Sequence, residues 1–158
     1  MFDIILFSPK IPPNTGNIIR LSANSGSRLH LIKPLGFTLD EKSCRRAGLD
    51  YHALSNVKIH DDLPTCINSL NQPRLFALTT KSQNSVFNVN FKPGDALLFG
   101  SETAGLPAKV HDSIHDEKKL KLPMVEGSRS LNLANAVSIV IYEAWRQLNF
   151  AGSLTCSE

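Results

Sequence analysis

Short segments with strand character alternate with longer segments of helical spacing along this chain. Each predicted strand spans four residues and is followed by polar residues, glycine or proline, as buried parallel strands are: residues 4–7, 29–32, 57–60, 75–78, 96–99 and 119–122. Strands that alternate with helices predict an α/β fold, with a mainly parallel sheet flanked by helices.

Capping residues predict where the first helices begin and end. Asn14 is expected to cap a helix that runs to about Gly26, because asparagine favours helix starts and glycine favours helix ends. A short basic helix is expected near Asp40–Arg46. Acidic residues predict the start of a helix over Asp61–Leu70, since carboxylates stabilise a helix N-terminus.

The last predicted helix, Ser130–Leu148, begins in an unusually polar cluster. Ser130 is expected to cap it, and Asn132 and Asn135 are three residues apart, which would place them on one helix face. Unpaired backbone N–H groups at such an end can hold an anion or a carboxylate. We therefore expect a ligand site at this helix start. Residues 134–144 are rich in Ala, Val and Ile on most sides, so we expect the helix that follows to be buried all round.

The length of 158 residues predicts one domain over residues 1–150, followed by a flexible tail over residues 151–158. No apolar run approaches the roughly 20 residues that span a bilayer, so no membrane association is expected.

The chain contains three cysteines, Cys44, Cys66 and Cys156. Their odd number and unrelated spacings argue against a disulfide framework and favour a reducing, cytoplasmic location.

The net charge is +3, which is too small to identify a nucleic-acid partner by itself. Its distribution is uneven, because residues 1–52 contain seven Lys or Arg against four Asp or Glu. Any surface for a polyanion is therefore expected in this third of the chain, although a basic run such as Lys42, Arg45 and Arg46 is usually just a solvated helix face.

Three polar segments follow predicted strands: residues 12–20, 98–107 and 122–140. Ligands of open α/β sheets bind at the carboxyl ends of strands, so these segments can converge on one pocket. Taken singly, each also has an ordinary structural interpretation, such as a helix cap or a turn.

The usual nucleotide motifs do not fit. Residues 100–105 have the outer glycines of a P-loop, but Leu106 and Pro107 replace the required Lys and Ser or Thr. No Gly-x-Gly-x-x-Gly follows the first strand, which leaves a dinucleotide site unsupported. Glu102 would repel phosphate, so a cationic or neutral ligand group, such as a sulfonium or an amine, is expected beside it.

These three segments match a known family. Residues 14–20 (Asn-Thr-Gly-Asn-Ile-Ile-Arg), 100–107 (Gly-Ser-Glu-Thr-Ala-Gly-Leu-Pro) and 128–137 (Ser-Arg-Ser-Leu-Asn-Leu-Ala-Asn-Ala-Val) make nearly the whole chain resemble the SPOUT-class RNA methyltransferases of the SpoU type. Within that class it is most similar to the single-domain enzymes that 2′-O-methylate the wobble nucleotide 34, a cytidine or modified uridine, of leucine tRNAs. It departs from their pattern at Ala104, where those enzymes carry Arg.

The resemblance implies a deep C-terminal trefoil knot, S-adenosylmethionine as the cofactor, and a homodimer in which each active site borrows residues from the neighbouring subunit. It implies catalytic roles for Arg20 and Asn14, and a place for Tyr142 in the dimer interface. Arg20 would bind a phosphate and stabilise the developing alkoxide, because a guanidinium is a poor proton acceptor at neutral pH. The implied cofactor contacts are Leu78, Gly100, Leu122, Met124, Ser130 and Asn135, and the implied RNA contacts are Arg45, Arg46 and Arg129.

Other functions remain open at this stage. The enzyme could methylate another tRNA position or ribosomal RNA, or the chain could be an RNA-binding member of the fold without catalysis.

His111 and His115 are spaced i and i+4, which suits zinc, but no third ligand is evident nearby, so no metal is expected. His30 is interpreted as a packing residue.

Overall fold

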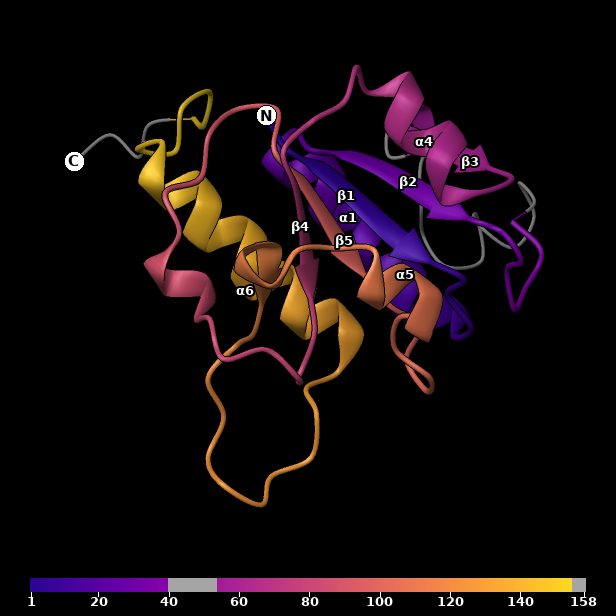
Figure 1. The fold of residues 1–158 in the computed structure, drawn as a ribbon. Helices are drawn as coiled ribbons and strands as arrows, with labels where there is room; N and C mark the ends of the chain where they lie inside the picture. Colours follow the sequence, from indigo (N-terminus) through magenta and orange to yellow (C-terminus); the bar gives the residue numbers. More distant parts are fainter. Residues whose placement is uncertain (40–53, 155–158) are drawn as a thin grey trace.

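The computed structural model describes residues 1–39 and 54–154. The basic helix predicted near residues 40–46, and with it Arg45 and Arg46, lies outside the described residues. The elements follow the predicted alternation of strands and helices (Figure 1). No helix in the described ranges is long and apolar enough to cross a membrane.

The described strands form one six-stranded, fully parallel sheet in the order β3-β2-β1-β5-β4-β6. All six predicted strands are confirmed: β1 Asp3–Phe7, β2 Arg28–Ile32, β3 Val57–His60, β4 Leu75–Leu78, β5 Ala96–Phe99 and β6 Lys119–Leu120. β6 is shorter than predicted. After one bridge from Lys121 to Ser85 the chain reaches Pro123, which has no N–H to donate to a ladder.

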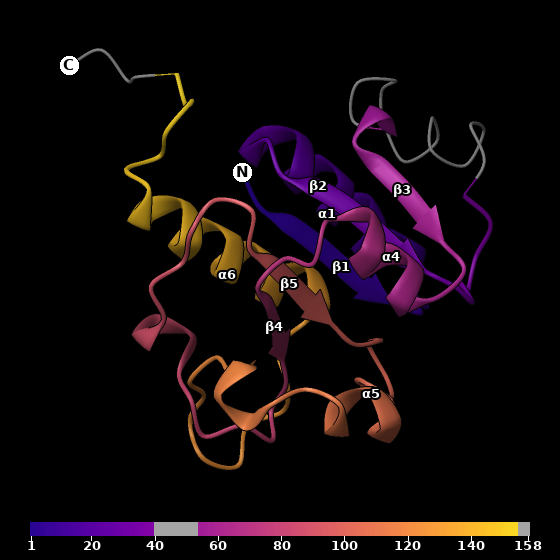
Figure 2. The same ribbon diagram turned by 45° about the horizontal axis from the view of Figure 1, so that its top comes forward.

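Helices cover both faces of the sheet. They are α1 Pro12–Ser25, α4 Leu63–Ser69, α5 Ala108–Asp112 and α6 Leu133–Gln147, with 3₁₀ turns at η1 Val86–Asn88 and η2 Asp116–Lys118. Figures 1 and 2 show α4 and α5 on one side of the sheet and α1 and α6 on the other. The prediction of a parallel α/β fold is therefore confirmed.

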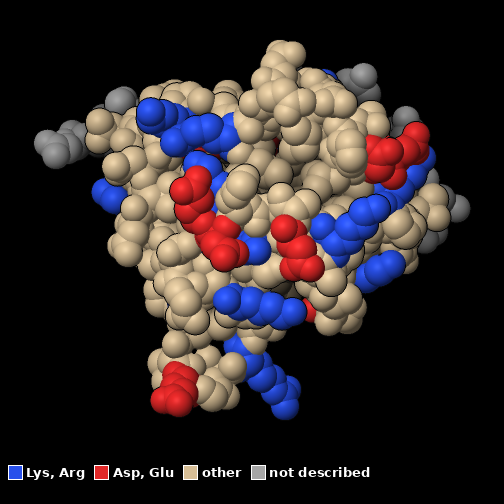
Figure 3. Space-filling view, in the orientation of Figure 1, with Lys and Arg blue, Asp and Glu red and all other residues tan. Residues whose placement is uncertain are grey.

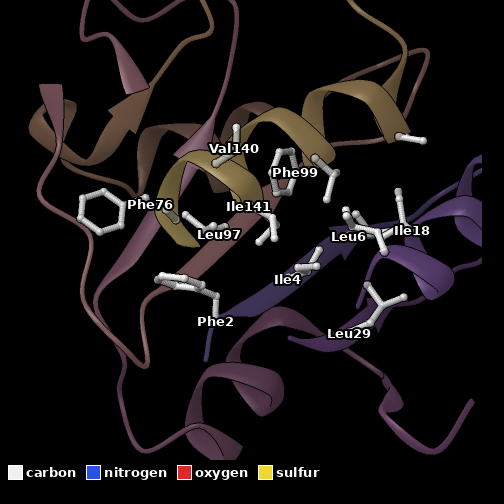
Figure 4. Close-up of a cluster of buried hydrophobic side chains, with 14 of the residues drawn as sticks. Phe2, Ile4, Leu6, Ile18, Leu29, Phe76, Leu97, Phe99, Val140 and Ile141 are labelled. Atoms are coloured by element: carbon white, nitrogen blue, oxygen red, sulfur yellow. The ribbon is translucent and has the colours of Figure 1, made fainter. Parts of the chain in front are cut away.

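The sheet separates two hydrophobic cores because successive strand residues point to opposite faces. Ile4 and Leu6 of β1 belong to the larger core, under α1 and α6, where Ile18 and Ile141 pack against them (Figure 4). Ile5, between them, belongs to the smaller core under α4 and α5. Ile4, Ile5 and Leu6 of β1 are thus fully buried on both faces of the sheet, which explains why they are all apolar.

Two predicted helix starts are wrong. α1 begins at Pro12 with Ile11 as the N-cap and no side-chain cap, so Asn14 lies inside the first turn. Proline suits the first helical position because its missing N–H would be unpaired there in any case. α6 is capped by Asn132 rather than Ser130, and the Asn132 side chain accepts from the backbone N–H of Asn135. The predicted end of α1 at Gly26, in the left-handed conformation, is confirmed.

The last helix is not buried all round within the single chain; the sequence expectation concerned a helix of the implied knot and dimer. Val137, Val140 and Ile141 are fully buried, whereas Ile139 and Tyr142 are 39% and 46% exposed. Ile139 and Tyr142 lie on one side of α6, since they are three residues apart. Both side chains are largely apolar, but no other part of the described chain covers them.

Candidate cofactor and active site

The candidate site is a cavity of about 510 Å³ at the carboxyl ends of β4 and β5. Its walls come from the residues after β4, the loop after β5, the first residues of α1, and the long loop between β6 and α6, which extends from the body of the protein in Figure 1. The sequence prediction that three polar segments converge on one pocket is therefore confirmed. Pockets of about 300–1,000 Å³ are typical of small-molecule sites.

The loop after β5 is folded tightly enough to require glycine. Ser101 and Gly105 exchange two backbone hydrogen bonds of 3.1 and 3.0 Å, and the Ser101 hydroxyl accepts a third from the N–H of Ala104 at 3.3 Å. A Cβ on Gly100 would lie 2.2 Å from the carbonyl carbon of Gly105, closer than real Cβ contacts. The absent side chain at Gly100 therefore lets the loop fold back over the strand end and shape the cavity wall.

Side-chain hydrogen bonds join the three polar segments. The Glu102 carboxylate accepts from the backbone N–H groups of Lys10 at 2.8 Å and Ile11 at 3.1 Å, and from Asn14 Nδ2 at 3.1 Å. Asn132 Nδ2 in turn donates to Asn14 Oδ1 at 2.9 Å. Asn14 is thus held from both sides, and its amide fixes the start of α1 against the other two segments.

Asn132 also orders the start of α6. Its Oδ1 accepts from the backbone N–H groups of Ala134 at 2.9 Å and Asn135 at 3.3 Å. One asparagine therefore caps α6 and positions Asn14, because its oxygen and its nitrogen serve different partners. This dual contact explains why the helix starts at Leu133 rather than at Ser130.

The Glu102 carboxylate is held in its ionised form. Burial disfavours its charge, but the hydrogen bonds from Lys10, Asn14 and Ile11 outweigh burial and lower the pKa of Glu102 below its ordinary value. A fixed negative charge in the cavity wall suits a cationic ligand group, as the sequence predicts.

Glu102→Gln should lower the free energy of unfolding at neutral pH by about 1–3 kcal/mol, because the new amide nitrogen would face N–H donors and leave one unpaired. A group with a lowered folded-state pKa contributes stability above its unfolded pKa, and that stability is lost as pH falls through the folded value. The difference between wild type and variant should therefore shrink as the solution is acidified. Thermal melts from neutral pH down to pH about 3 measure it.

Glu126→Gln is the matched control, since Glu126 is an exposed carboxylate on the loop between β6 and α6. It should change the melting temperature little at any pH. A Glu102→Gln deficit that stays constant on acidification would contradict the role assigned to the ionised carboxylate.

Most predicted ligand contacts lie in the cavity wall. The residues among them that line it are Asn14, Leu78, Gly100, Leu122, Met124 and Ser130. Asn135 does not line it; its backbone N–H donates to Asn132, and the residue is exposed. Arg20 and Arg129 are exposed and outside the lining of this chain's cavity, and Tyr142 lies on α6.

Several lining residues are absent from the predicted set. Thr79, Thr80 and Lys81 line the cavity directly after β4, where the rule on strand ends could have identified them. His111 also lines it, and its Nε2 is buried without a hydrogen-bond partner in the described part of the chain. This nitrogen could contact a polar group of a bound ligand. From the sequence alone, His111 is considered only as a metal ligand.

Comparisons with known proteins agree with this geometry. A tRNA (cytidine(34)-2′-O)-methyltransferase of Escherichia coli K12 is 54% identical over 154 residues, covering 98% of each chain. A solved structure described as giving insight into 2′-OH methylation of C/U34 on tRNA has a TM-score of 0.86 and 42% identity, covering 95% of this chain and 97% of its own.

A third similar structure contains a bound cofactor. The SpoU methyltransferase AviRb of Streptomyces viridochromogenes, in complex with AdoMet, has a TM-score of 0.80 and 25% identity, covering 94% of this chain and 61% of its own. The SpoU rRNA methylase family matches residues 1–142 of the present sequence. The chain therefore belongs to the SpoU methylase family.

Proposed function

We propose that this protein transfers the methyl group of S-adenosylmethionine to the ribose 2′-oxygen of the wobble nucleotide 34 in leucine tRNAs. The observation that carries the proposal is the 54% identity, over 98% of both chains, to an enzyme that acts at cytidine 34. A likeness of this extent includes all three segments that form the cavity.

The size of the cavity and the charge of its wall suit S-adenosylmethionine. Residues after β4, β5 and β6 line the cavity and could contact an adenosine through their backbone groups. Leu78 and Leu122 offer apolar contact, and His111, whose buried Nε2 has no hydrogen-bond partner in the described part of the chain, offers a polar one. Glu102 supplies a negative charge for the sulfonium. The cofactor supplies a methyl group already activated by that positive charge, so the protein has mainly to align the ribose and stabilise the oxygen.

Arg20 is the proposed electrostatic catalyst. Its guanidinium, which is cationic at neutral pH, would bind a phosphate of the RNA and stabilise negative charge as it develops on the 2′-oxygen, while the proton passes to water or a phosphate oxygen. Asn14 has a positioning role in this scheme. Its amide binds Glu102 and Asn132, and so sets the start of the helix that carries Arg20.

Recognition of tRNA would depend on individual phosphate contacts. Figure 3 shows Lys and Arg interspersed with Asp and Glu over one face of the protein, so this face carries no uniformly basic field. Arg129, on the exposed loop between β6 and α6, is a proposed RNA contact beside the cavity, and Arg45 and Arg46 are proposed further contacts.

The proposal includes a homodimer and the C-terminal trefoil knot that the family resemblance implies. The exposed side of α6 supports a dimer, because Ile139 and Tyr142 leave apolar area uncovered there. The Tyr142 ring also packs edge-on against Trp145 and makes a tilted contact with Phe150, which adds aromatic area beside it. Arg20 lies outside the cavity lining of its own chain, which supports a role at the site of the second subunit.

Ile139→Glu should weaken dimerisation by about 10²-fold, since association would bury an unpaired carboxylate. Sedimentation velocity at micromolar concentration should show a dimer for the wild type and a monomer for the variant. Leu154→Glu is the control, because Leu154 is 96% exposed and lies outside α6. A dimer of unchanged stability in Ile139→Glu would exclude this side of α6 as the interface.

Methyl transfer from labelled S-adenosylmethionine to leucine tRNAs that lack the wobble 2′-O-methyl group tests the function directly. The expected result is label at the 2′-oxygen of nucleotide 34, located by nucleoside mapping. Cofactor binding without transfer would contradict the tRNA substrate and direct the assay to ribosomal RNA. Absence of both binding and transfer would favour an RNA-binding protein without catalysis.

A further inference from the structure

A second cluster of reactive side chains lies on the opposite half of the sheet from the cofactor cavity. It consists of His30 on β2, His60 on β3 and Cys66 on α4. Their three potential ligand atoms, two imidazole nitrogens and one sulfur, all lie within 4.8 Å of one another. None of these residues lines the cavity, so the cluster has no part in the proposed methyl transfer.

The cluster lies beneath the surface but remains reachable from one side. His30 is 1% exposed and Cys66 is fully buried, whereas His60 is half-buried at the sheet edge formed by β3. His30 Nδ1 and His60 Nε2 are 3.0 Å apart. Two imidazoles and a thiol therefore point at one small volume between β2, β3 and α4.

A buried carboxylate fixes the orientation of the innermost histidine. Asp3 is 1% exposed, and its Oδ1 lies 3.1 Å from His30 Nε2. Arg28 holds the same carboxylate through two hydrogen bonds, from Nε at 2.6 Å and Nη2 at 2.7 Å. An ionised Asp3 requires a proton on His30 Nε2, and this leaves the lone pair of His30 Nδ1 directed at His60 and Cys66.

This arrangement of ligand and outer carboxylate is the one that protein zinc sites use. A histidine that binds zinc through one nitrogen commonly donates its other N–H to a carboxylate, which orients the ring and raises its basicity. The donor set of two nitrogens and one thiolate sulfur also selects zinc or a similar borderline-soft cation over magnesium or calcium.

We propose that His30 Nδ1, His60 Nε2 and Cys66 Sγ form a binding site for one zinc ion, with solvent as the fourth ligand. Tetrahedral zinc with bonds of about 2.0–2.1 Å to nitrogen and 2.3 Å to sulfur separates its ligand atoms by roughly 3.3–3.7 Å. The present separations reach this range through movements of about 1 Å or less. The half-buried side of His60 gives solvent and the ion a path to the site.

Binding of one zinc ion releases one proton, which comes from the Cys66 thiol. The hydrogen bond between His30 and His60 is replaced by two zinc–nitrogen bonds, and the shared proton moves to His60 Nδ1. The Cys66 S–H bond breaks as the zinc–sulfur bond forms, and one proton per ion leaves to solvent. The bound ion would link β2, β3 and α4, and so stabilise an edge of the sheet that the cofactor does not touch.

Cobalt(II) titration of the full chain, followed by absorption spectroscopy, tests the site. Chelator-treated protein carrying Cys44→Ser and Cys156→Ser should bind one Co²⁺ per chain, with the bands of a tetrahedral ion and a thiolate-to-cobalt charge-transfer band. Cys66→Ser should remove the charge-transfer band, and His60→Gln should lower Co²⁺ affinity by at least about 10-fold. Zinc should displace the cobalt and raise the melting temperature of the parent chain but not of Cys66→Ser.

His111→Gln with His115→Gln is the matched control, and should leave Co²⁺ binding unchanged. Binding of less than about one-tenth of an equivalent of Co²⁺ by the parent chain would overturn the proposal. Binding that survives both Cys66→Ser and His60→Gln in folded protein would also overturn it, since the ion would then lie elsewhere. Neither readout depends on methyl transfer, so this result stands apart from the outcome of the RNA assay.

Discussion

Gly100→Ala is expected to abolish useful binding of S-adenosylmethionine. The new Cβ would lie 2.2 Å from the carbonyl carbon of Gly105 and 2.4 Å from the backbone nitrogen of Leu106, and neither backbone atom can move without opening the loop after β5. That loop forms much of the cavity wall. We expect the dissociation constant to rise at least about 100-fold, or 2.7 kcal/mol, as measured by isothermal titration calorimetry.

The same substitution should lower the free energy of unfolding by about 1–3 kcal/mol, the range for overpacked sites. Gly16→Ala is the matched control, because a Cβ at Gly16 meets no atom within 4 Å and lies within α1. It should leave cofactor affinity unchanged and stabilise the helix by about 0.5–1 kcal/mol. Cofactor binding by Gly100→Ala within a few-fold of the wild type would show that the loop adapts to the side chain.

The positions of the strands and their mainly parallel direction could be predicted, because strands buried on both faces are apolar at successive residues. Ile4, Ile5 and Leu6 are all apolar since each faces one of two cores. Helix starts are harder to predict, because several residues in a row can act as caps. Ser130 and Asn132 are both good capping types, and the contact of Asn132 with Asn14, which is 118 positions away in the chain, accompanies the choice of Asn132.

The position of the pocket followed from a general rule about parallel sheets, but its internal contacts did not. Glu102 binds the start of α1, more than 85 residues away, and no local spacing encodes that contact. The need for glycine at position 100 depends likewise on where Gly105 and Leu106 fold back. His30, His60 and Cys66 have no metal-ligand spacing in the sequence, because three separate elements bring them together.

On one side of α6 the sequence predicted burial that the single chain does not show. Its apolar composition predicted burial, and the single chain leaves Ile139 and Tyr142 exposed. An apolar residue can be buried by its own chain or by a partner chain, and its sequence does not distinguish the two cases. The difference between composition and burial is consistent with the proposed dimer, on which the next prediction depends.

Arg20→Ala should reduce methyl transfer by about 10²–10³-fold, the usual cost of removing one group that stabilises a developing oxyanion. S-adenosylmethionine affinity should be unchanged, since Arg20 does not line the cavity of its own chain. Single-turnover transfer to tRNA, with calorimetry for the cofactor, measures the two effects separately. Asn17→Ala, at another exposed position of α1, is the control, and equal losses of transfer and cofactor binding in Arg20→Ala would instead indicate a structural role.

Mixed dimers then decide which site Arg20 serves. If Arg20 acts at the neighbouring subunit, a dimer of one Arg20→Ala chain and one Gly100→Ala chain contains one site with both an intact loop and an intact arginine. Random pairing after co-expression makes half of the dimers mixed, so about a quarter of wild-type activity should return, although each variant alone is inactive. If Arg20 serves its own chain, every site in the mixture lacks one of the two residues and no activity returns. The size of the recovered activity therefore separates a shared active site from two independent ones.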